Sequence, residues 1–258
     1  MRLASANRTN PMPRPNLDER HRRILKFVVE SHVMSAEPVG SQYVRMAYHL
    51  SISPATIRGA MKRLEEEGLL DHPHTSAGRV PTETGYRYYV DALMEPEPIA
   101  PATRRALDRK LRKDEWAIED LQKAAADALA QLSGQLAMVA MCPRTGTPTP
   151  RVRIGGAENI AAQPEFQTAD RLRGLVTLLA EPEHLTRALD AFADSGSVRV
   201  TIGRELGEEA MRACSLVGTG IASHAFRGSL GVLGPVRMPY PRLLSLVSYA
   251  GERLAEFS

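Results

Sequence analysis

The 258-residue chain has few cysteines, few aromatic side chains and no long apolar segment. Its two cysteines, Cys142 and Cys214, lie far apart and show no metal-type spacing. We therefore expect two buried thiols in a reducing compartment. No apolar run reaches the ~18 residues that a membrane span needs, and the first residues lack the apolar region of a secretory signal. These absences predict a cytoplasmic protein without a membrane partner.

The sequence also lacks the short motifs of common enzymes. It contains no G-x-S-x-G, no phosphate-binding P-loop and no H-E-x-x-H, and GTGIAS at residues 218–223 has no lysine for phosphate chemistry. His72 and His74 have no third or fourth ligand near them in the sequence, which argues against a metal site. We therefore predict no catalytic residues, no cofactor and no metal.

Charge is distributed unevenly along the chain. Residues 1–94 contain 13 Lys and Arg against 10 Asp and Glu, together with five of the seven histidines. Residues 95–258 contain 20 residues of each sign, so the formal charge of +3 belongs to the N-terminal third. A localised positive segment is typical of a part that meets phosphate groups, although this excess alone is small.

Periodicity and breaks divide the chain into five parts. Prolines mark residues 1–16 as a disordered leader and residues 95–101, EPEPIAP, as a linker. Residues 17–94 begin with three short helices. The second is expected to run from an N-cap at Ser41 through Leu50, and the first to have an apolar side made of Leu17, Ile24, Leu25, Val28 and Val29. Leucines recur at spacings near three, four and seven in residues 102–141, which predicts one long helix, either a dimer seam or a helix packed within the chain. Residues 151–258 mix strands and helices, which predicts an α+β domain with a small sheet.

The third short helix combines a buried stripe with an unusual opposite face. Ser53 is its expected N-cap, Pro54 its first residue, and Gly68 follows its last turn. The expected buried stripe consists of Ile57, Ala60, Met61 and Leu64. The other side carries small residues and cations, which suits a helix that approaches a polyanion; three glutamates at its end support a merely solvated face instead. The predicted contacts with the major groove and its phosphates are Ser53, Thr56, Arg58, Lys62 and Arg63.

A short polar segment, LLDHPHTSAGRVPT at residues 69–82, follows this helix. Leu69 and Leu70 can begin a strand, HTSAGR can turn, and Val80 can return before Pro81. This pattern predicts a β-hairpin, or wing. Hydroxyl and guanidinium groups suit phosphate oxygens or the edge of a minor groove. The predicted wing contacts are Thr75, Ser76 and Arg79.

Several of these segments resemble the HrcA family of heat-inducible transcription repressors. EPVGS, SPATIR and LEEEGLLDHPHTSAGRVPTETGYRYYVD are similar to its winged helix-turn-helix domain, over residues 17–94. GGAENI, PEF, VTIGREL and GVLGPVRMPY are similar to stretches of its GAF-like C-terminal domain. The resemblance implies a homodimer that binds double-stranded DNA at an inverted repeat of the CIRCE type, upstream of chaperone operons. It also implies that a GroEL-type chaperonin keeps the repressor active until heat-damaged protein competes for it.

Two departures from the family pattern affect what the resemblance implies. The family usually has Asn and an acidic residue after TIR, where this chain has Gly59 and Ala60, so the bases read can differ. Between Met141 and Arg153, a Pro/Thr connector stands where the family has further strands and an inserted dimerisation subdomain. We therefore predict a shortened member with a truncated GAF-like domain, which makes residues 102–141 a more attractive dimer seam.

Other interpretations stay open at this point. A winged-helix regulator that responds to a small ligand and binds an unrelated operator would be favoured by a large pocket with convergent polar groups. An enzyme with an attached DNA-binding module has no catalytic residues to support it. The Gly155–Asn159 loop could cradle an anion and Arg237 could hold a partner or an anion, but a tight turn and a structural arginine are favoured.

Overall fold

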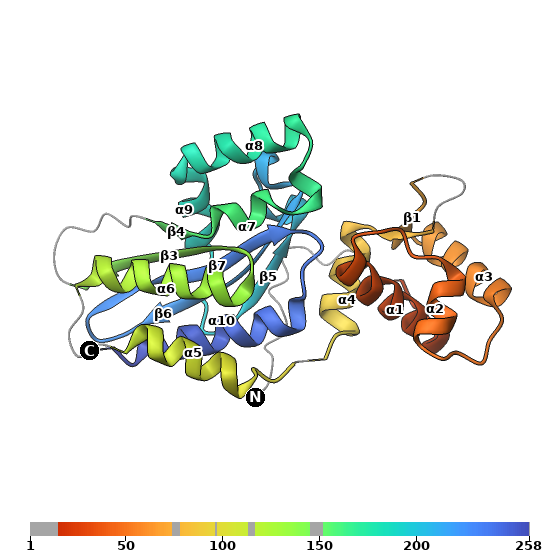
Figure 1. Cartoon of the computed structure of the whole chain (residues 1–258), viewed down its shortest axis with the longest axis horizontal. Helices are drawn as coiled ribbons and strands as arrows, with labels where there is room; N and C mark the ends of the chain where they lie inside the picture. Colours follow the sequence, from red (N-terminus) through yellow and green to blue (C-terminus); the bar gives the residue numbers. More distant parts are fainter. Residues whose placement is uncertain (1–14, 74–77, 96, 113–116, 145–151, 258) are drawn as a thin grey trace. The chain divides into compact units, whose positions relative to one another are not determined.

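The structure is a computed structural model, and it describes residues 15–73, 78–95, 97–112, 117–144 and 152–257. The chain divides into two compact units, one that ends at Glu95 and one that follows it. Both contain helices and strands (Figure 1), as the α+β class requires. None of the helices formed by the described residues combines the length and the apolar character of a membrane span.

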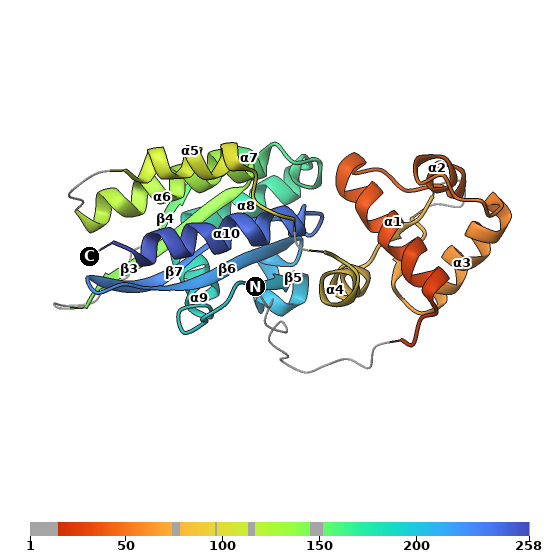
Figure 2. The same cartoon turned by 90° about the horizontal axis from the view of Figure 1, so that it is seen from below.

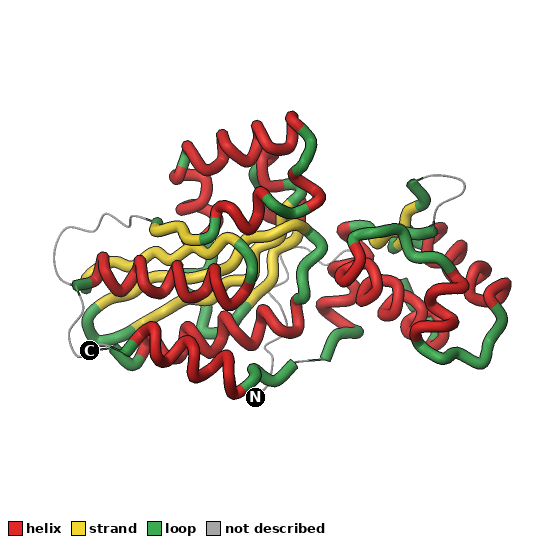
Figure 3. Tube along the Cα trace, viewed as in Figure 1, coloured by secondary structure: helices red, strands yellow, loops and turns green. Residues whose placement is uncertain are grey.

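The described part of the N-terminal unit contains helices and one short hairpin (Figure 3). Its elements are α1 (Glu19–Ser35), α2 (Ser41–Ala47), α3 (Pro54–Glu66), β1 (Leu70–Asp71), β2 (Val80–Pro81) and α4 (Glu83–Ala92). The two strands are antiparallel, with Leu70 opposite Pro81 and Asp71 opposite Val80. A hairpin therefore follows the third helix, as the turn signals predict.

The first two helices test the periodicity and the capping signals. The apolar positions expected to face the core of α1 are all buried: Leu17, Ile24, Leu25, Val28 and Val29. In α2, the N-cap is Gly40 and not Ser41, and the helix ends at Ala47, three residues before the predicted end. His49, just beyond that end, has a φ of 48°, a left-handed conformation that does not continue a helix. The boundary of α2 is thus a correction to the sequence prediction.

Two close backbone approaches hold the base of the hairpin. A Cβ atom at Gly78 would collide with the carbonyl group of Val39, and one at Gly85 would collide with the carbonyl oxygen of Leu69. Val39 and Arg79 exchange both of their backbone hydrogen bonds, at 2.8 and 2.9 Å. The polar segment after α3 is therefore anchored by its backbone, which is how it can follow a helix without an apolar core of its own.

The described part of the C-terminal unit is an antiparallel sheet between two layers of helices (Figures 1 and 2). Its strand order is β4–β3–β7–β6–β5. The strands are β3 (Leu136–Pro143), β4 (Arg153–Gly155), β5 (Arg199–Ile202), β6 (Cys214–Ala222) and β7 (Phe226–Pro235). One face is covered by α6 (Ile118–Ser133) and α10 (Tyr240–Ala255), with α5 (Pro101–Leu111) packed against both. The other face is covered by α7 (Ala157–Ala161), α8 (Ala169–Ala180) and α9 (Pro182–Asp190).

Both faces of this sheet are packed with apolar side chains. Leu136, Met138 and Ala140 of β3 join a cluster that contains Phe166 and Phe192 on the α7–α9 side. On α10, the four residues predicted to point inward are buried: Leu243, Leu244, Val247 and Leu254. Short 3₁₀ helices at Pro164–Phe166, Gly203–Leu206 and Glu209–Met211 complete the connections.

The prediction of one long helix over residues 102–141 is wrong. α5 ends at Leu111, α6 ends at Ser133, and residues 136–143 form β3, a strand inside the sheet. Gly134 ends α6 with a φ of 68°. The error has a physical reason, because residues 136–141 are buried on both faces of the sheet, and such a continuous apolar run fits a central strand as well as a helix.

The leucines of this segment pack within the chain. Leu107 and Leu111 of α5 and Leu121 and Leu129 of α6 are each at most 2% exposed. Since their side chains are already covered, this leucine stripe is not available as a dimer seam. The alternative, packing inside the C-terminal unit, is the correct one.

Candidate nucleic-acid interface

The cap of α3 fixes the first exposed hydroxyl group of that helix. The Ser53 side chain accepts a hydrogen bond from the backbone N–H of Thr56 at 3.1 Å, and the two hydroxyl oxygens lie 2.9 Å apart. Pro54 is the first helical residue, where its missing N–H removes no helical hydrogen bond. The predicted start of the helix is confirmed, and the cap holds two of the predicted contact residues together.

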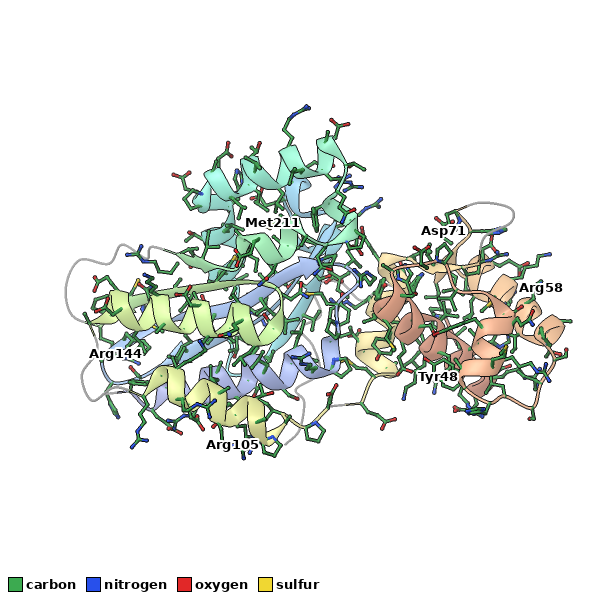
Figure 4. The ribbon with its side chains drawn as sticks, in the orientation of Figure 1. Tyr48, Arg58, Asp71, Arg105, Arg144 and Met211 are labelled. Carbon is green, nitrogen blue, oxygen red and sulfur yellow. The ribbon has the colours of Figure 1, made fainter. Side chains whose placement is uncertain are left out.

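The two sides of α3 differ as the sequence predicts. The stripe of Ile57, Ala60, Met61 and Leu64 is buried. The exposed positions include every predicted contact on this helix, namely Ser53, Thr56, Arg58, Lys62 and Arg63, and also Gly59. Figure 4 labels Arg58 on this helix. No acidic residue occurs between Pro54 and Arg63, so the exposed side of these turns carries only positive charge.

The glutamates at the end of α3 are matched by arginines. Glu65 Oε2 lies 2.8 Å from Arg79 Nε, and Arg63 contacts Glu67 at 2.7 Å and Glu66 at 3.6 Å. Their negative charges are therefore partly neutralised within the unit. This pairing weakens the interpretation of α3 as an ordinary solvated helix with mixed charges.

Arg58 and Lys62 are in a different situation from Arg63. Within the described residues, neither of them forms an ion pair or a side-chain hydrogen bond, whereas Arg63 has two carboxylate neighbours. Unpaired, exposed cations on one helix face are available to a polyanion without the cost of breaking an existing ion pair. The positive potential of the first turns thus comes mainly from Arg58 and Lys62.

The predicted wing residues are only partly covered by the structure. Thr75 and Ser76 lie outside the described residues, as does His74. Asp71, labelled in Figure 4, ends the outgoing strand. The Arg79 side chain is only 16% exposed and contacts Glu65 of α3, so it lies at the base of the hairpin. Its position differs from the freely exposed guanidinium that the sequence suggests.

The structure also exposes residues that the sequence analysis does not single out. Tyr43 and Met46 of α2 are 51% and 65% exposed, and Met34 at the end of α1 is 82% exposed. α2 has only seven residues, with Val44 as its one buried side chain, so its periodicity is too short to identify an outer face. Tyr43 adds a hydroxyl donor of the kind that contacts phosphate oxygens.

A polar network supports the helices behind α3. The Tyr48 ring stacks on Phe27 with 3.8 Å between ring centroids, and Tyr48 Oη lies 3.3 Å from the Ser31 hydroxyl. Burial raises the pKa of Glu30, and hydrogen bonds from the Tyr48 and Tyr89 hydroxyls act in the opposite direction. Residues of α1, α4 and the end of α2 are thereby linked through one carboxylate.

Arg237 and the Gly155–Asn159 loop, for which the sequence leaves several roles possible, make contacts within the C-terminal unit. Arg237 donates to Glu165 at 2.7 and 3.2 Å, which joins the segment before α10 to the loop after α7. Asn159 donates to the carbonyl oxygens of Gln135 and Ala130, at 3.1 and 3.3 Å, and so closes the C-terminal end of α6. The favoured structural role of Arg237 is confirmed, whereas Ala157 to Asn159 belong to α7, so the predicted tight turn is reduced to Gly156, which has a φ of 72° between β4 and that helix.

The cysteines differ from each other. Cys214 is buried in the sheet, and burial raises the pKa of its thiol to about 12. Cys142 is partly exposed, so the expectation of two buried thiols is wrong for this residue. Across the part of the chain that the structure describes, no three His, Cys, Asp or Glu side chains gather as metal ligands.

Comparisons with known proteins bear on both units. The family model described as "HrcA protein C terminal domain" matches residues 105–244. A relative from Acaryochloris marina is 29% identical, with 93% of this chain and 97% of that protein covered. One from Parafrankia sp. is 31% identical, with 92% and 99% covered. Both are named "Heat-inducible transcription repressor HrcA".

The same comparisons address chain length and fold. The alignment with the Acaryochloris relative extends over 358 residues, although this chain has 258, so that relative contains segments without a counterpart here. A crystal structure described only as that of a hypothetical protein is similar in fold, with a TM-score of 0.73 and 20% identity. It covers 93% of this chain and 98% of the solved one.

Proposed function

The chain belongs to the HrcA family of heat-inducible transcription repressors, and from this membership we propose that it represses transcription by binding an inverted-repeat operator through a winged helix-turn-helix at residues 17–94. The observation that carries the proposal is the charge arrangement of α3. Arg58 and Lys62 are exposed and unpaired within the described residues, while the glutamates of this helix contact arginines. A positive face on an exposed helix beside a hairpin suits the DNA backbone and groove.

The proposed base-reading surface is the first half of α3. Thr56 and Arg58 enter the major groove, where arginine recognises guanine through two hydrogen bonds, and Lys62, one turn further on, contacts the phosphates beside it. Ser53 supports this surface because its hydroxyl group holds that of Thr56 at 2.9 Å. Gly59 has no side chain in the middle of the exposed face, so the helix backbone is uncovered there. A Cβ atom at this position would meet nothing within 4 Å.

The remaining predicted contacts hold the flanks of the site. Arg63 exchanges its glutamate neighbours for a phosphate, which is feasible because its side chain is 60% exposed. Arg79 positions the hairpin on α3 through Glu65 and contributes charge near the backbone of the DNA. Thr75 and Ser76 contact phosphates at the hairpin tip, as the sequence predicts.

The proposal extends to assembly and control. Two copies bind as a homodimer, since a two-fold axis in the protein matches an inverted repeat of the CIRCE type. The C-terminal unit is a truncated GAF-like domain through which a GroEL-type chaperonin adjusts repressor activity. Family membership supports these steps. Sedimentation of the protein with and without operator DNA tests the dimer, and a monomer on a full repeat would contradict it.

The alternative is a regulator of the same architecture that responds to a small ligand and binds an unrelated operator. The apolar clusters on both sides of the sheet fill the space where an interior ligand would sit. That observation argues against an interior ligand only, and chaperonin control is supported by family membership. DNA selection with randomised duplexes separates the two, because an unrelated operator would be recovered in place of the CIRCE-type repeat.

The test of the DNA contacts is a fluorescence-anisotropy titration with a CIRCE-type duplex and a scrambled duplex, at two salt concentrations. Arg58→Ala is expected to cost about 1–3 kcal/mol on the repeat and to relax the preference for it. Lys62→Ala is expected to weaken both complexes alike and to lower the salt slope by about one. Arg173→Ala is the charge-matched control, because this exposed arginine lies on α8 in the other unit. Equal losses on both duplexes for Arg58→Ala would contradict its base-reading role.

A further inference from the structure

A groove with a concentration of arginines lies between α5 and α10 of the C-terminal unit. Its volume is about 580 Å³, and it is lined by Arg105, Asp108, Arg109, Arg112, Tyr249 and Arg253. Figure 4 labels Arg105 on α5. The described residues that line this space bring four guanidinium groups and one carboxylate, so this part of the lining is positive.

Three of these arginines form one row that follows α5 to its end. Arg105 and Arg109, four residues apart, lie on the same side of the helix, and Arg112 directly follows its last residue in an extended conformation. At a rise of 1.5 Å per residue, Arg105 and Arg109 are about 6 Å apart along the helix axis. None of the three forms an ion pair or side-chain hydrogen bond with another described residue. A helix C-terminus favours cations in its last turn, which accounts for Arg109 but not for Arg105.

Asp108, the one carboxylate among the described lining residues, already has partners. Both oxygens of Asp108 accept a hydrogen bond from the Tyr249 hydroxyl, at 2.8 and 3.0 Å, and Asp108 lies 3.1 Å from Arg253 Nε. The guanidinium of Arg104 stands over the Tyr249 ring, 5.3 Å from its centroid. Arg253 also contacts Glu256, so this arginine is already paired, while Asp108, occupied by Tyr249 and Arg253, does not neutralise the row on α5.

We propose that this groove binds a soluble oligophosphate, a small molecule with two or more linked phosphate groups. The guanidinium fork matches phosphate oxygens in pairs, and several guanidinium groups along one groove engage linked phosphates better than a single charge. The volume falls within the range of small-molecule pockets, about 300–1,000 Å³. A concave site of this size fits a compact anion better than a duplex. The site is separate from α3 and goes beyond the repressor function proposed above.

The probe for the test is inorganic tripolyphosphate, titrated calorimetrically into the full-length protein. Arg105→Ala/Arg109→Ala is expected to weaken binding at least about tenfold, because two charge-assisted contacts are lost. Arg171→Ala/Arg173→Ala removes the same charge from exposed positions on α8 and is expected to leave the affinity unchanged. Arg58→Ala/Lys62→Ala removes the cations of α3 and is also expected to leave it unchanged.

The other outcomes would overturn the proposal. Equal affinity in all four proteins, or a loss only in the α3 variant, would place the phosphate elsewhere. If the Arg105→Ala/Arg109→Ala protein lost affinity for random-sequence duplex but not for tripolyphosphate, the groove would be a nucleic-acid surface. Both side chains are exposed, so the variant is expected to fold and to bind operator DNA as the wild type does. A failed operator titration in the wild type would instead count against the repressor proposal alone.

Discussion

At the scale of single residues, Gly59 makes α3 less stable than an alanine would, and no contact inside the N-terminal unit requires a glycine there. A Cβ atom there would meet nothing within 4 Å, so no packing contact excludes a side chain. A glycine inside a helix costs about 0.5–1 kcal/mol relative to alanine. We attribute this glycine to the close approach of DNA to the exposed face.

Gly59→Ala is therefore expected to stabilise α3 by about 0.5–1 kcal/mol. Hydrogen exchange of the α3 amides in the full-length protein measures this change. The matched control is Gly85→Ala, which is expected to destabilise the same unit because its Cβ would collide with the carbonyl oxygen of Leu69. Faster exchange in the Gly59→Ala protein would show that the glycine is needed for the fold.

Glu30 gives a pH dependence with a defined sign. Burial raises the pKa of its carboxyl above the ordinary value of 4.5, so the folded state keeps a proton that the unfolded chain releases. The stability of the unit therefore falls as the pH rises from about 4.5 through the folded-state pKa. Glu30→Gln removes this titrating group. The free energy of unfolding of the variant minus that of the wild type, measured with urea, is therefore expected to be larger at pH 7 than at pH 4. A variant-minus-wild-type difference that does not change with pH would contradict this assignment.

At the scale of elements, the hairpin and α3 are joined by the contact between Arg79 and Glu65. The side chains are 16% and 35% exposed, and Nε and Oε2 are 2.8 Å apart. The backbone of Arg79 is held as well, through its pair of hydrogen bonds with Val39. The hairpin is thus held against α3 by a partly buried ion pair, in addition to the backbone pairing with Val39.

A double-mutant cycle with Arg79→Ala and Glu65→Ala is expected to give a coupling energy of about 0.5–1.5 kcal/mol in the unfolding free energy. Arg79→Ala is also expected to weaken binding to operator and scrambled DNA alike, since it positions the hairpin and reads no base. A second cycle on the salt bridge between Arg63 and Glu67 serves as the reference. Its side chains are 60% and 30% exposed, so its coupling energy is expected to be smaller. A coupling near zero for Arg79 and Glu65 would remove the proposed role of this pair.

The elements also show which features the sequence predicts and why others escape it. The start of α3 and its buried stripe follow from local rules, because Ser53 caps the helix with its own side chain and the stripe repeats at helical spacing. β3 could not be recognised as a strand from the sequence. Residues Leu136 to Met141 are all apolar, so the alternation of apolar and polar residues that identifies a half-buried strand is missing. The place of Arg79 depends on Glu65, a contact across fourteen residues of chain that spacing cannot reveal.

At the scale of the whole molecule, the chain combines a complete N-terminal pattern with a shortened C-terminal unit. The five-stranded sheet forms although a relative contains segments without a counterpart here, since β3 pairs directly with β4 and β7 on either side. The leucines expected at a dimer seam are used for internal packing. The homodimer that we propose would therefore need another surface of the protein.

The central claim, that this chain is an operator-specific repressor despite its shortened C-terminal unit, is tested most directly by one titration. The full-length protein is titrated against a CIRCE-type duplex and its scrambled control at two salt concentrations, with and without GroEL. We predict tighter binding to the repeat at both salt concentrations, by at least about 10³-fold, and a further increase with GroEL. Equal affinity for both duplexes would contradict the claim, and would leave a winged helix whose operator has changed along with Gly59.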